Sequence, residues 1–227
     1  MKIFLPNSEI DERITKLIRS FRKQMDGETA EQMAKRGIHY NLNYGIGLVA
    51  LREKAKSLPN DAELADRLWH RRIRETMILA SLIIPKEDMT FERGLEWSFL
   101  IDNCELVEQA ALNVFSKVIS AEMLIEEWLG NENIYLRALA FYTLGWMFRF
   151  GEVSEALLRK GLDKANLQPG ADVFCLYRGV SHFLRQILRV KPEIKSECES
   201  LILNYQQSED KNLKWLATEI EEEIEFL

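Results

Sequence analysis

The residues with the clearest capacity for chemistry lie in the segment Asp102-Asn103-Cys104-Glu105-Leu106-Val107-Glu108. Glu108 follows Cys104 by four residues, so both side chains should share one face of a helix. A carboxylate on such a face can stabilise a developing positive charge or act as a general base. A solvated surface glutamate is the competing interpretation. Asp102 and Glu105 have the spacing of a capping box, which predicts that they hold the start of the helix.

Two later segments combine aromatic and basic residues. Tyr135 and Arg137 lie close together in one of them, and Arg178, His182 and Arg185 recur at helical spacing in the other. Arginine suits phosphate because its planar guanidinium can donate to two oxygens at once. Arginines on one helix face can also follow a phosphate backbone. A solvated basic surface explains the same arginines, and a single histidine on a helix is more often structural.

The elements that would position these residues are expected to be helices. Gly and Pro are sparse, at 11 and 5 residues, and apolar residues recur at three- and four-residue spacing along nearly the whole chain. Gly37 is expected to cap the second helix at its C-terminal end. The expected helices cover residues 10–21, 29–35, 47–57, 62–70, 73–84, 90–101, 105–116, 121–129, 134–149, 153–165, 173–190, 192–206 and 209–226.

Helix pairs repeat with a loose period of roughly 35 to 45 residues, set by turn residues such as Pro59, Pro85 and Pro192. This predicts an all-α fold, a right-handed superhelical stack of HEAT-like antiparallel helix pairs, because one pair cannot bury its own apolar face. We expect a single domain over residues 1–227, with residues 207–227 as an acidic C-terminal capping helix. The concave face of the stack is the expected binding surface.

The charge of the chain is uneven. The formal net charge is −6, from 30 Lys and Arg against 36 Asp and Glu. Residues 1–75 carry +4 and residues 151–195 carry +3, whereas residues 76–150 carry −6 and residues 196–227 carry −7. A basic surface over the whole protein is therefore excluded, and any phosphate-binding site must be local.

Several functional classes find no support in the sequence. The cysteines Cys104, Cys175 and Cys198 lack the close spacing of a metal site or a redox pair, so reduced thiols are expected. No P-loop, Gly-rich dinucleotide turn or His-Glu-x-x-His motif occurs, so neither a metal nor a nucleotide cofactor is expected. The longest apolar run ends at Pro85, well short of the ~20 residues of a membrane span. The first residues do not form an export signal, so a cytoplasmic location is expected.

Four segments together resemble the AlkD-like DNA alkylation repair family, which consists of glycosylases built from HEAT-like helical pairs. These segments cover the central and C-terminal two-thirds of the chain. They are Leu68-Trp69 with Arg74-Glu75, Asp102 to Glu108, Asn133 to Phe141, and Tyr177 to Gln186 followed by Lys191-Pro192-Glu193. Trp69 is interpreted most simply as a core residue, and Glu75 as favoured by a helix N-terminus.

The resemblance implies a role for each matching position. Glu108 stands where the family has its catalytic Asp, and Cys104 stands where it has an aromatic residue. His182 matches the second aromatic residue that faces the substrate. The functional Arg position matches Ala138, with Arg137 next to it, about 100° away around the helix. Whether the helix register brings Arg137 into that role is left open by the sequence.

Two functions follow as hypotheses. The resemblance implies a DNA glycosylase that hydrolyses the N-glycosidic bond of cationic N3- or N7-alkylpurines in duplex DNA, with Glu108 assisting bond cleavage. Arg137, Arg178 and Arg185 would then hold phosphates, and His182 would contact the lesion strand. Cys104 cannot supply the aromatic face that a cationic base prefers. The alternative is therefore a non-catalytic HEAT-like module that binds DNA or a protein partner.

Overall fold

Within residues 2–151, 153–170 and 174–227, which the computed structural model describes, the chain is helical apart from turns, irregular segments and one isolated β-bridge between Leu42 and Ile73. The predicted all-α fold class is confirmed. The chain forms two compact units, Met1–Val114 and Phe115–Leu227. None of the described helices is both long and apolar enough to cross a membrane.

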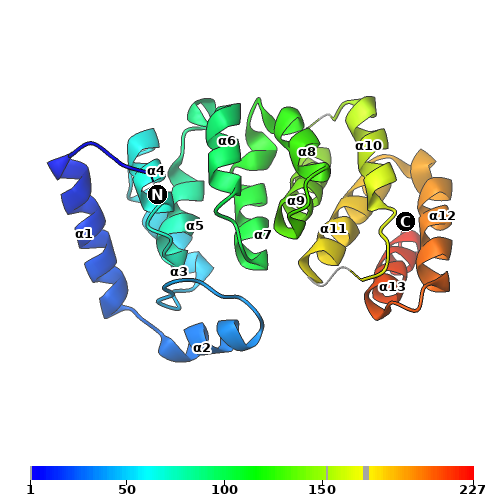
Figure 1. Ribbon diagram of the computed structural model, residues 1–227, viewed down its shortest axis with the longest axis horizontal. Helices are drawn as coiled ribbons and strands as arrows, with labels where there is room; N and C mark the ends of the chain where they lie inside the picture. Colours follow the sequence, from blue (N-terminus) through cyan, green and yellow to red (C-terminus); the bar gives the residue numbers. More distant parts are fainter. Residues whose placement is uncertain (1, 152, 171–173) are drawn as a thin grey trace. The chain divides into compact units, whose positions relative to one another are not determined.

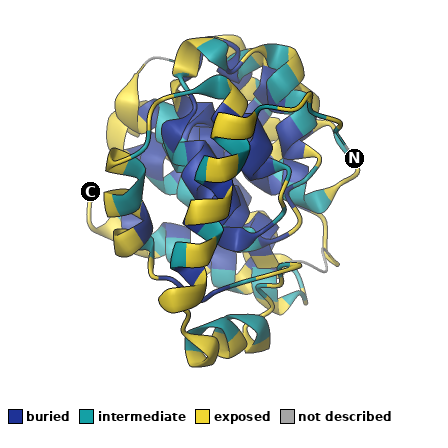
Figure 2. Cartoon of the chain, turned by 90° about the vertical axis from the view of Figure 1, so that its left-hand side faces the viewer, coloured by how far each residue is buried: buried dark blue, intermediate teal, exposed yellow. Residues whose placement is uncertain are grey.

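In the first unit, α4 packs against α5, and α5 also packs against α3 and α7 (Figure 1). The helix α2 has no buried residue, and Figure 2 shows it as largely exposed. As predicted, Gly37 ends α2, with a left-handed φ of 80° that glycine adopts without strain. The elements are α1 (Ser8–Lys23), α2 (Gly27–Lys35), α3 (Leu48–Lys56), α4 (Ala62–Trp69), α5 (Arg74–Ile83), η1 (Lys86–Asp88), α6 (Phe91–Ser98) and α7 (Cys104–Asn113).

Side-chain caps fix most of the helix starts in this unit. In α7 the cap is Asn103, whose Oδ1 accepts the backbone N–H of Leu106 at 3.0 Å. The prediction that Asp102 and Glu105 form a capping box was wrong. Asp102 lies one residue too early and is exposed, where it pairs with Arg72 at 2.7 Å. Glu105 instead accepts hydrogen bonds from the side chains of Tyr40 and Arg74.

The centre of the first unit contains two stacked tryptophans. The rings of Trp69 and Trp97 are 4.4 Å apart and inclined by only 7°, and both are fully buried. The indole N–H of Trp97 donates to the Asp66 carboxylate at 2.7 Å, and that of Trp69 donates to the carbonyl of Trp97 at 3.2 Å. Both buried indole N–H groups thus have an acceptor, as buried donors require. The interpretation of Trp69 as a core residue was right.

Glu75 lies at the start of α5 with no exposed surface. Its carboxylate accepts the backbone N–H groups of Tyr44 and Ile46, at 3.1 Å and 3.3 Å. It also lies 3.2 Å from the guanidinium of Arg74. A buried carboxylate needs such donors because desolvation penalises its charge. Glu75 therefore anchors the segment that precedes α3.

Arg74 connects this anchor to α7. Its guanidinium donates to both carboxylate oxygens of Glu105, at 2.7 Å and 2.8 Å, and to the carbonyl of Ile46 at 2.7 Å. The Tyr40 hydroxyl donates to the same Glu105 at 2.9 Å. Burial, together with the adjacent Glu105 charge, raises the pKa of Tyr40, so its hydroxyl remains a donor at neutral pH. We name Tyr40, Arg74, Glu75 and Glu105 the buried charge network.

In the second unit, α9 packs along α11, and α13 packs against both α11 and α12 (Figure 1). A Cβ on Gly179 would lie 3.1 Å from the carbonyl oxygen of Ala138, so glycine permits the close approach of α9 and α11. Residue 173, the predicted start of α11, lies outside the described residues. The elements are η2 (Phe115–Lys117), α8 (Ala121–Leu129), α9 (Ile134–Phe150), α10 (Glu155–Ala165), α11 (Phe174–Val190), η3 (Pro192–Ile194), α12 (Lys195–Gln207) and α13 (Lys211–Glu225).

We expect Glu75→Ala to lower the free energy of unfolding by about 3 kcal/mol, because it leaves two buried amides and part of Arg74 without an acceptor. Urea denaturation followed by circular dichroism measures this change. Glu53→Ala is the matched control, since Glu53 pairs with Lys56 at 2.7 Å on the exposed side of α3. The control should cost less than about 1 kcal/mol. Equal effects of the two substitutions would show that the network does not stabilise the unit.

Candidate nucleic-acid interface

Cys104 and Glu108 lie in the first unit, on the partly exposed side of α7. Both side chains are half-buried, whereas Leu106 and Val107 between them are buried in the core. The Asn103 side chain sets the start of this helix and also donates to the carbonyl of His39 at 3.2 Å. The expected common face of Cys104 and Glu108 therefore exists. Glu108 could accept a proton there, and Cys104 gives that face a small thiol rather than a ring.

The other predicted site residues lie in the second unit. His182 on α11 is half-buried between two rings of α9, with ring centroids 5.3 Å from Tyr142 and 4.7 Å from Trp146. A Cβ on Gly145 would lie 2.5 Å from the His182 ring, so only glycine allows this fit. The histidine is thus fixed against α9 as part of an aromatic cluster.

The environment keeps His182 neutral at physiological pH. Burial lowers its pKa to about 4, with further lowering by the positive charges of Arg185, Arg149 and Arg189. Its Nε2 is buried and has no hydrogen-bond partner among the described residues. A neutral imidazole cannot form an ion pair with phosphate, but it can support a stack of rings.

Arg178 and Arg185 flank His182 on the same face of α11, but their surroundings differ. Arg178 is exposed. Arg185 donates to Glu223 at 3.0 Å and to Glu219 at 3.2 Å, both on α13. Arg189, one turn further on, donates to Glu223 at 2.5 Å. Because α13 already neutralises Arg185, phosphate contact at Arg185 would require exchange of an existing ion pair.

Tyr135 and Arg137 lie at the start of α9 but on different sides of it. Tyr135 precedes Trp146 by 11 residues, which places the two within about 20° around the helix, whereas Arg137 precedes it by 9, about 180° away. Ala138 is fully buried against α11. These positions bear on the question that the sequence left open, namely whether the helix register brings Arg137 into the role of the family's Arg. Position 138 faces the core, and Arg137 faces away from the side that carries His182.

Arg137 instead lines a separate cavity of about 380 Å³. Its Nε is buried and has no hydrogen-bond partner among the described residues. Lys164 and Asp163 lie at the same cavity, and their side chains are 3.8 Å apart. The remaining lining residues are Asn166, Leu167, Gln168, Pro169, Gly170 and Leu176. An anion could satisfy Arg137 here, away from His182.

The structure therefore brings most of the predicted residues of the second unit to one surface, which we name the α9–α11 face. Sequence reasoning missed three of its members, Tyr142, Trp146 and Arg149. Their spacing of four and three residues on one apolar helix was a signal, but core packing explained it equally well. The α9–α11 face consists of Tyr135, Tyr142, Trp146, Arg149, Arg178, His182 and Arg185.

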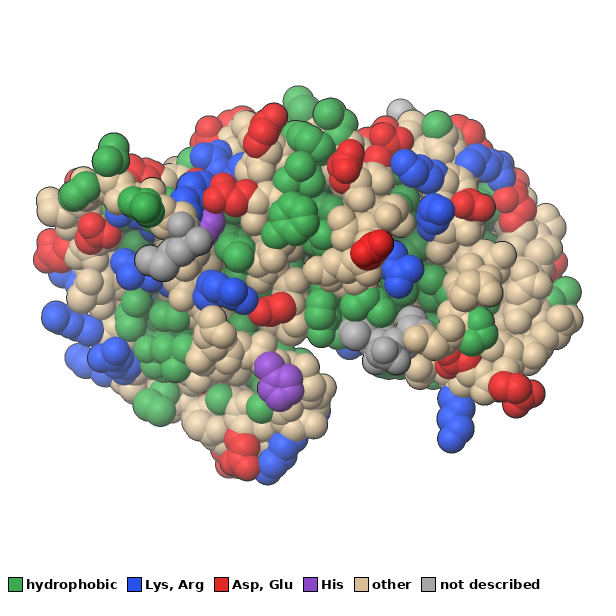
Figure 3. All heavy atoms as spheres, in the orientation of Figure 1, with side chains coloured by type: hydrophobic (Ala, Val, Ile, Leu, Met, Phe, Trp, Pro, Cys, Tyr) green, Lys and Arg blue, Asp and Glu red, His purple; other side chains and the backbone are tan. Residues whose placement is uncertain are grey.

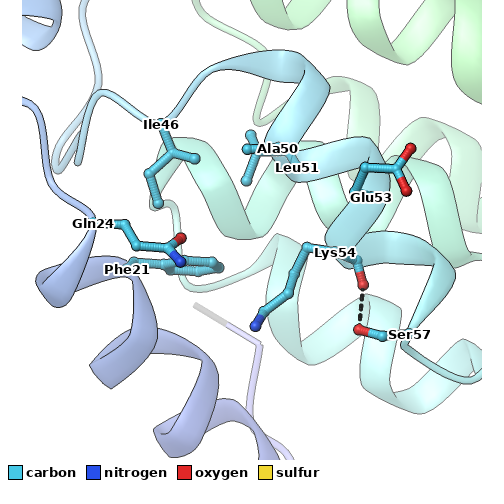
Figure 4. Close-up of a pocket in the computed structure, with 8 residues that line it drawn as sticks. All are labelled: Phe21, Gln24, Ile46, Ala50, Leu51, Glu53, Lys54 and Ser57. Carbon is cyan, nitrogen blue, oxygen red and sulfur yellow. Dashed lines mark hydrogen bonds between the residues drawn. The ribbon is translucent and has the colours of Figure 1, made fainter.

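A further cavity of about 350 Å³ lies between α1 and α3, with Phe21, Ile46 and Leu51 in its wall (Figure 4). Lys54 reaches toward Phe21, and the hydroxyl of Ser57 donates to the Lys54 carbonyl at 2.7 Å. The Ser57 hydroxyl thus bonds to a backbone carbonyl and not to a basic side chain that could activate it. Among the described residues, no three His, Cys, Asp or Glu side chains are grouped as metal ligands.

Comparisons with known proteins agree with this architecture. The profile of a family described as DNA alkylation repair enzyme matches residues 17–193. A solved structure is similar with a TM-score of 0.76 at 14% sequence identity, covering 93% of this chain and 94% of the other. That protein belongs to a family described as related to the HEAT-like repeat DNA glycosylases, with affinity for branched DNA structures. A search of curated protein sequences found no match.

We expect the ring protons of His182 to titrate with a midpoint of about 4 in an NMR pH titration, well below the ordinary value of 6.5. Because the unfolded chain binds this proton more readily, stability should fall as the pH decreases from 6.5 toward 4. His182→Phe should make the urea midpoint less sensitive to pH across that range. An unchanged pH dependence in this variant would show that His182 is not desolvated.

Proposed function

Because the chain belongs to the DNA alkylation repair enzyme family, we propose that it binds DNA and, like the structurally similar protein, has affinity for branched DNA structures. The observation that best supports this proposal is the α9–α11 face. There the exposed guanidinium of Arg149 lies 5.6 Å over the Trp146 ring, and Arg178 projects from the neighbouring helix. Cations beside aromatic faces suit the alternating phosphates and bases of a nucleic acid.

Arg149 is better placed for phosphate than Arg185. It forms no ion pair with another described residue, whereas Arg185 is held by Glu219 and Glu223. Moving Arg149 from its ring contact to a phosphate oxygen would exchange a weak interaction for a charge-assisted hydrogen bond. We therefore assign phosphate contact on this face to Arg149, and we add Arg178 because its side chain is exposed on the neighbouring helix.

The first unit carries exposed basic residues of its own, which suit phosphate contact. Arg19, Arg22 and Lys23 are exposed along α1, and Figure 3 shows Lys and Arg side chains gathered at the outer edge that α1 forms. The protein as a whole remains acidic. Binding should therefore depend on a few contacts, with a shallow dependence on salt concentration.

We expect Arg149→Ala to weaken binding of a labelled branched DNA and to reduce the slope of log affinity against log salt by about 1. Fluorescence anisotropy at several salt concentrations measures both effects. Lys195→Ala, an exposed charge on α12, is the control and should leave the slope unchanged.

Arg137→Ala, made in parallel, distinguishes the two sides of α9. If the α9–α11 face binds the phosphates, Arg137→Ala should leave the slope of log affinity against log salt unchanged. A reduced slope for Arg137→Ala but not for Arg149→Ala would move the phosphate contact to the cavity beside Lys164.

A second candidate function is base excision by Glu108, which the family and the half-buried position of this residue favour. In such a reaction the bonding electrons leave with the cationic base and neutralise it. The carboxylate stabilises the positive charge on the sugar and takes a proton from the water that attacks it. Cys104 supplies no aromatic contact to the base, so DNA binding without excision remains the first proposal.

Incubation with duplex DNA that contains 7-methylguanine tests the second candidate. A catalytic Glu108 predicts release of free base by the unaltered protein and at least about 100-fold less release by Glu108→Gln. Glu92→Gln, an exposed carboxylate on α6, is the control and should retain full release. Equal release by the Glu108→Gln variant, or none by the unaltered protein, would exclude excision through Glu108.

A further inference from the structure

The helix α9 carries aromatic residues at four-residue intervals along one side. Tyr142, Trp146 and Phe150 are separated by about 40° per step, so their side chains lie along one side of the helix. The rings of Trp146 and Phe150 are 5.6 Å apart and inclined by only 10°. His182 lies against Tyr142 and Trp146 from α11. We name Tyr142, Trp146, Phe150 and His182 the aromatic strip.

One end of this strip is open to solvent. Phe150 is 54% exposed, and Trp146 is half-buried. By contrast, Trp69, Trp97 and Trp128 are buried in the cores of their units. Large aromatic side chains normally lose most of their accessible surface on folding. An exposed phenylalanine stacked on a partly exposed tryptophan is therefore a feature that folding alone does not explain.

Cations accompany the open end of the strip. The Arg149 guanidinium is 5.6 Å from the centre of the Trp146 ring, and the Lys117 ammonium is 5.7 Å from the centre of the Phe150 ring. A hydrophobic protein partner would meet two charges here that it must desolvate. A polyanion that carries flat aromatic groups complements both the positive charges and the rings.

We infer that the aromatic strip is a stacking site for unpaired nucleobases, and that it recognises the bases exposed at a branch or in a single-stranded arm of DNA. This inference rests on the proposed DNA-binding function and specifies the part of the DNA that is recognised. Every base presents a flat face, so stacking on Trp146 and Phe150 is independent of sequence. Bases within an intact duplex are already stacked on one another and cannot use the site. The strip therefore distinguishes branched DNA from duplex DNA.

The test compares labelled DNA forks that differ only in their unpaired arm. One arm carries normal thymidines, and the other carries abasic sugars that keep the phosphates but remove the bases. A fully paired duplex is the reference. We expect the unaltered protein to bind the thymidine arm about 10-fold more tightly than the abasic arm, as stacking energies per base imply.

Trp146→Ala should bind both forks equally. Phe99→Ala removes an aromatic ring of the first unit that is 63% exposed, and this control should keep the 10-fold preference. Thermal unfolding confirms that the variants are folded. If Trp146→Ala does not fold, Phe150→Ala provides the same comparison, because its exposed ring contributes less to the core.

The outcomes separate the inference from the function on which it rests. A protein that binds forks and duplex without responding to abasic arms, or a Trp146→Ala variant that keeps the preference, would overturn the stacking site and leave DNA binding intact. The strip would then be assigned to a protein partner. An unaltered protein that binds none of the three DNAs would overturn both the inference and the proposed function.

Discussion

The first unit depends on the buried charge network. Arg74 and Glu75 are 3% and 0% exposed, and Glu105 closes the network from α7. Taking such charges out of water is costly, and the cost is offset only when nearly every donor and acceptor is satisfied. Burial alone would lower the pKa of Arg74, but its hydrogen bonds to Glu105 raise the pKa overall, so the guanidinium stays charged. The segments that supply hydrogen-bond partners to Arg74 and Glu75 are therefore held in fixed positions.

This constraint determines where Glu108 lies. Glu105 is held by Arg74 and Tyr40, and Asn103 is held by the carbonyl of His39, so the first turn of α7 is fixed at two points. Glu108 lies one turn further along the same helix. Its position therefore follows from a network that serves stability, and the network does not by itself require a catalytic role.

The sequence predicted the helices well because their periodicity is local, and it predicted the burial of Trp69 for the same reason. It failed where a partner lies far along the chain. Glu105 was assigned to a capping box because nothing nearby indicates Arg74, 31 residues earlier. The ion pair of Arg185 with Glu223, 38 residues later, was not predicted for the same reason, whereas the phosphate contact of Arg185 stays a prediction. The role of a charged residue is the hardest to predict from sequence, since the same side chain can form a buried ion pair or lie exposed on the surface.

The distribution of charge also bears on the proposed binding of DNA. Non-specific binding to duplex DNA is almost wholly electrostatic. A chain with a net charge of −6 therefore attracts the phosphates only weakly. The α13 carboxylates Glu219 and Glu223 reduce the positive charge of α11 further by pairing with Arg185. Stacking on an aromatic surface is far less sensitive to net charge. Under the proposed function, a weakly attractive surface that bears exposed rings would select DNA by its unpaired bases, because the phosphates alone would not hold it.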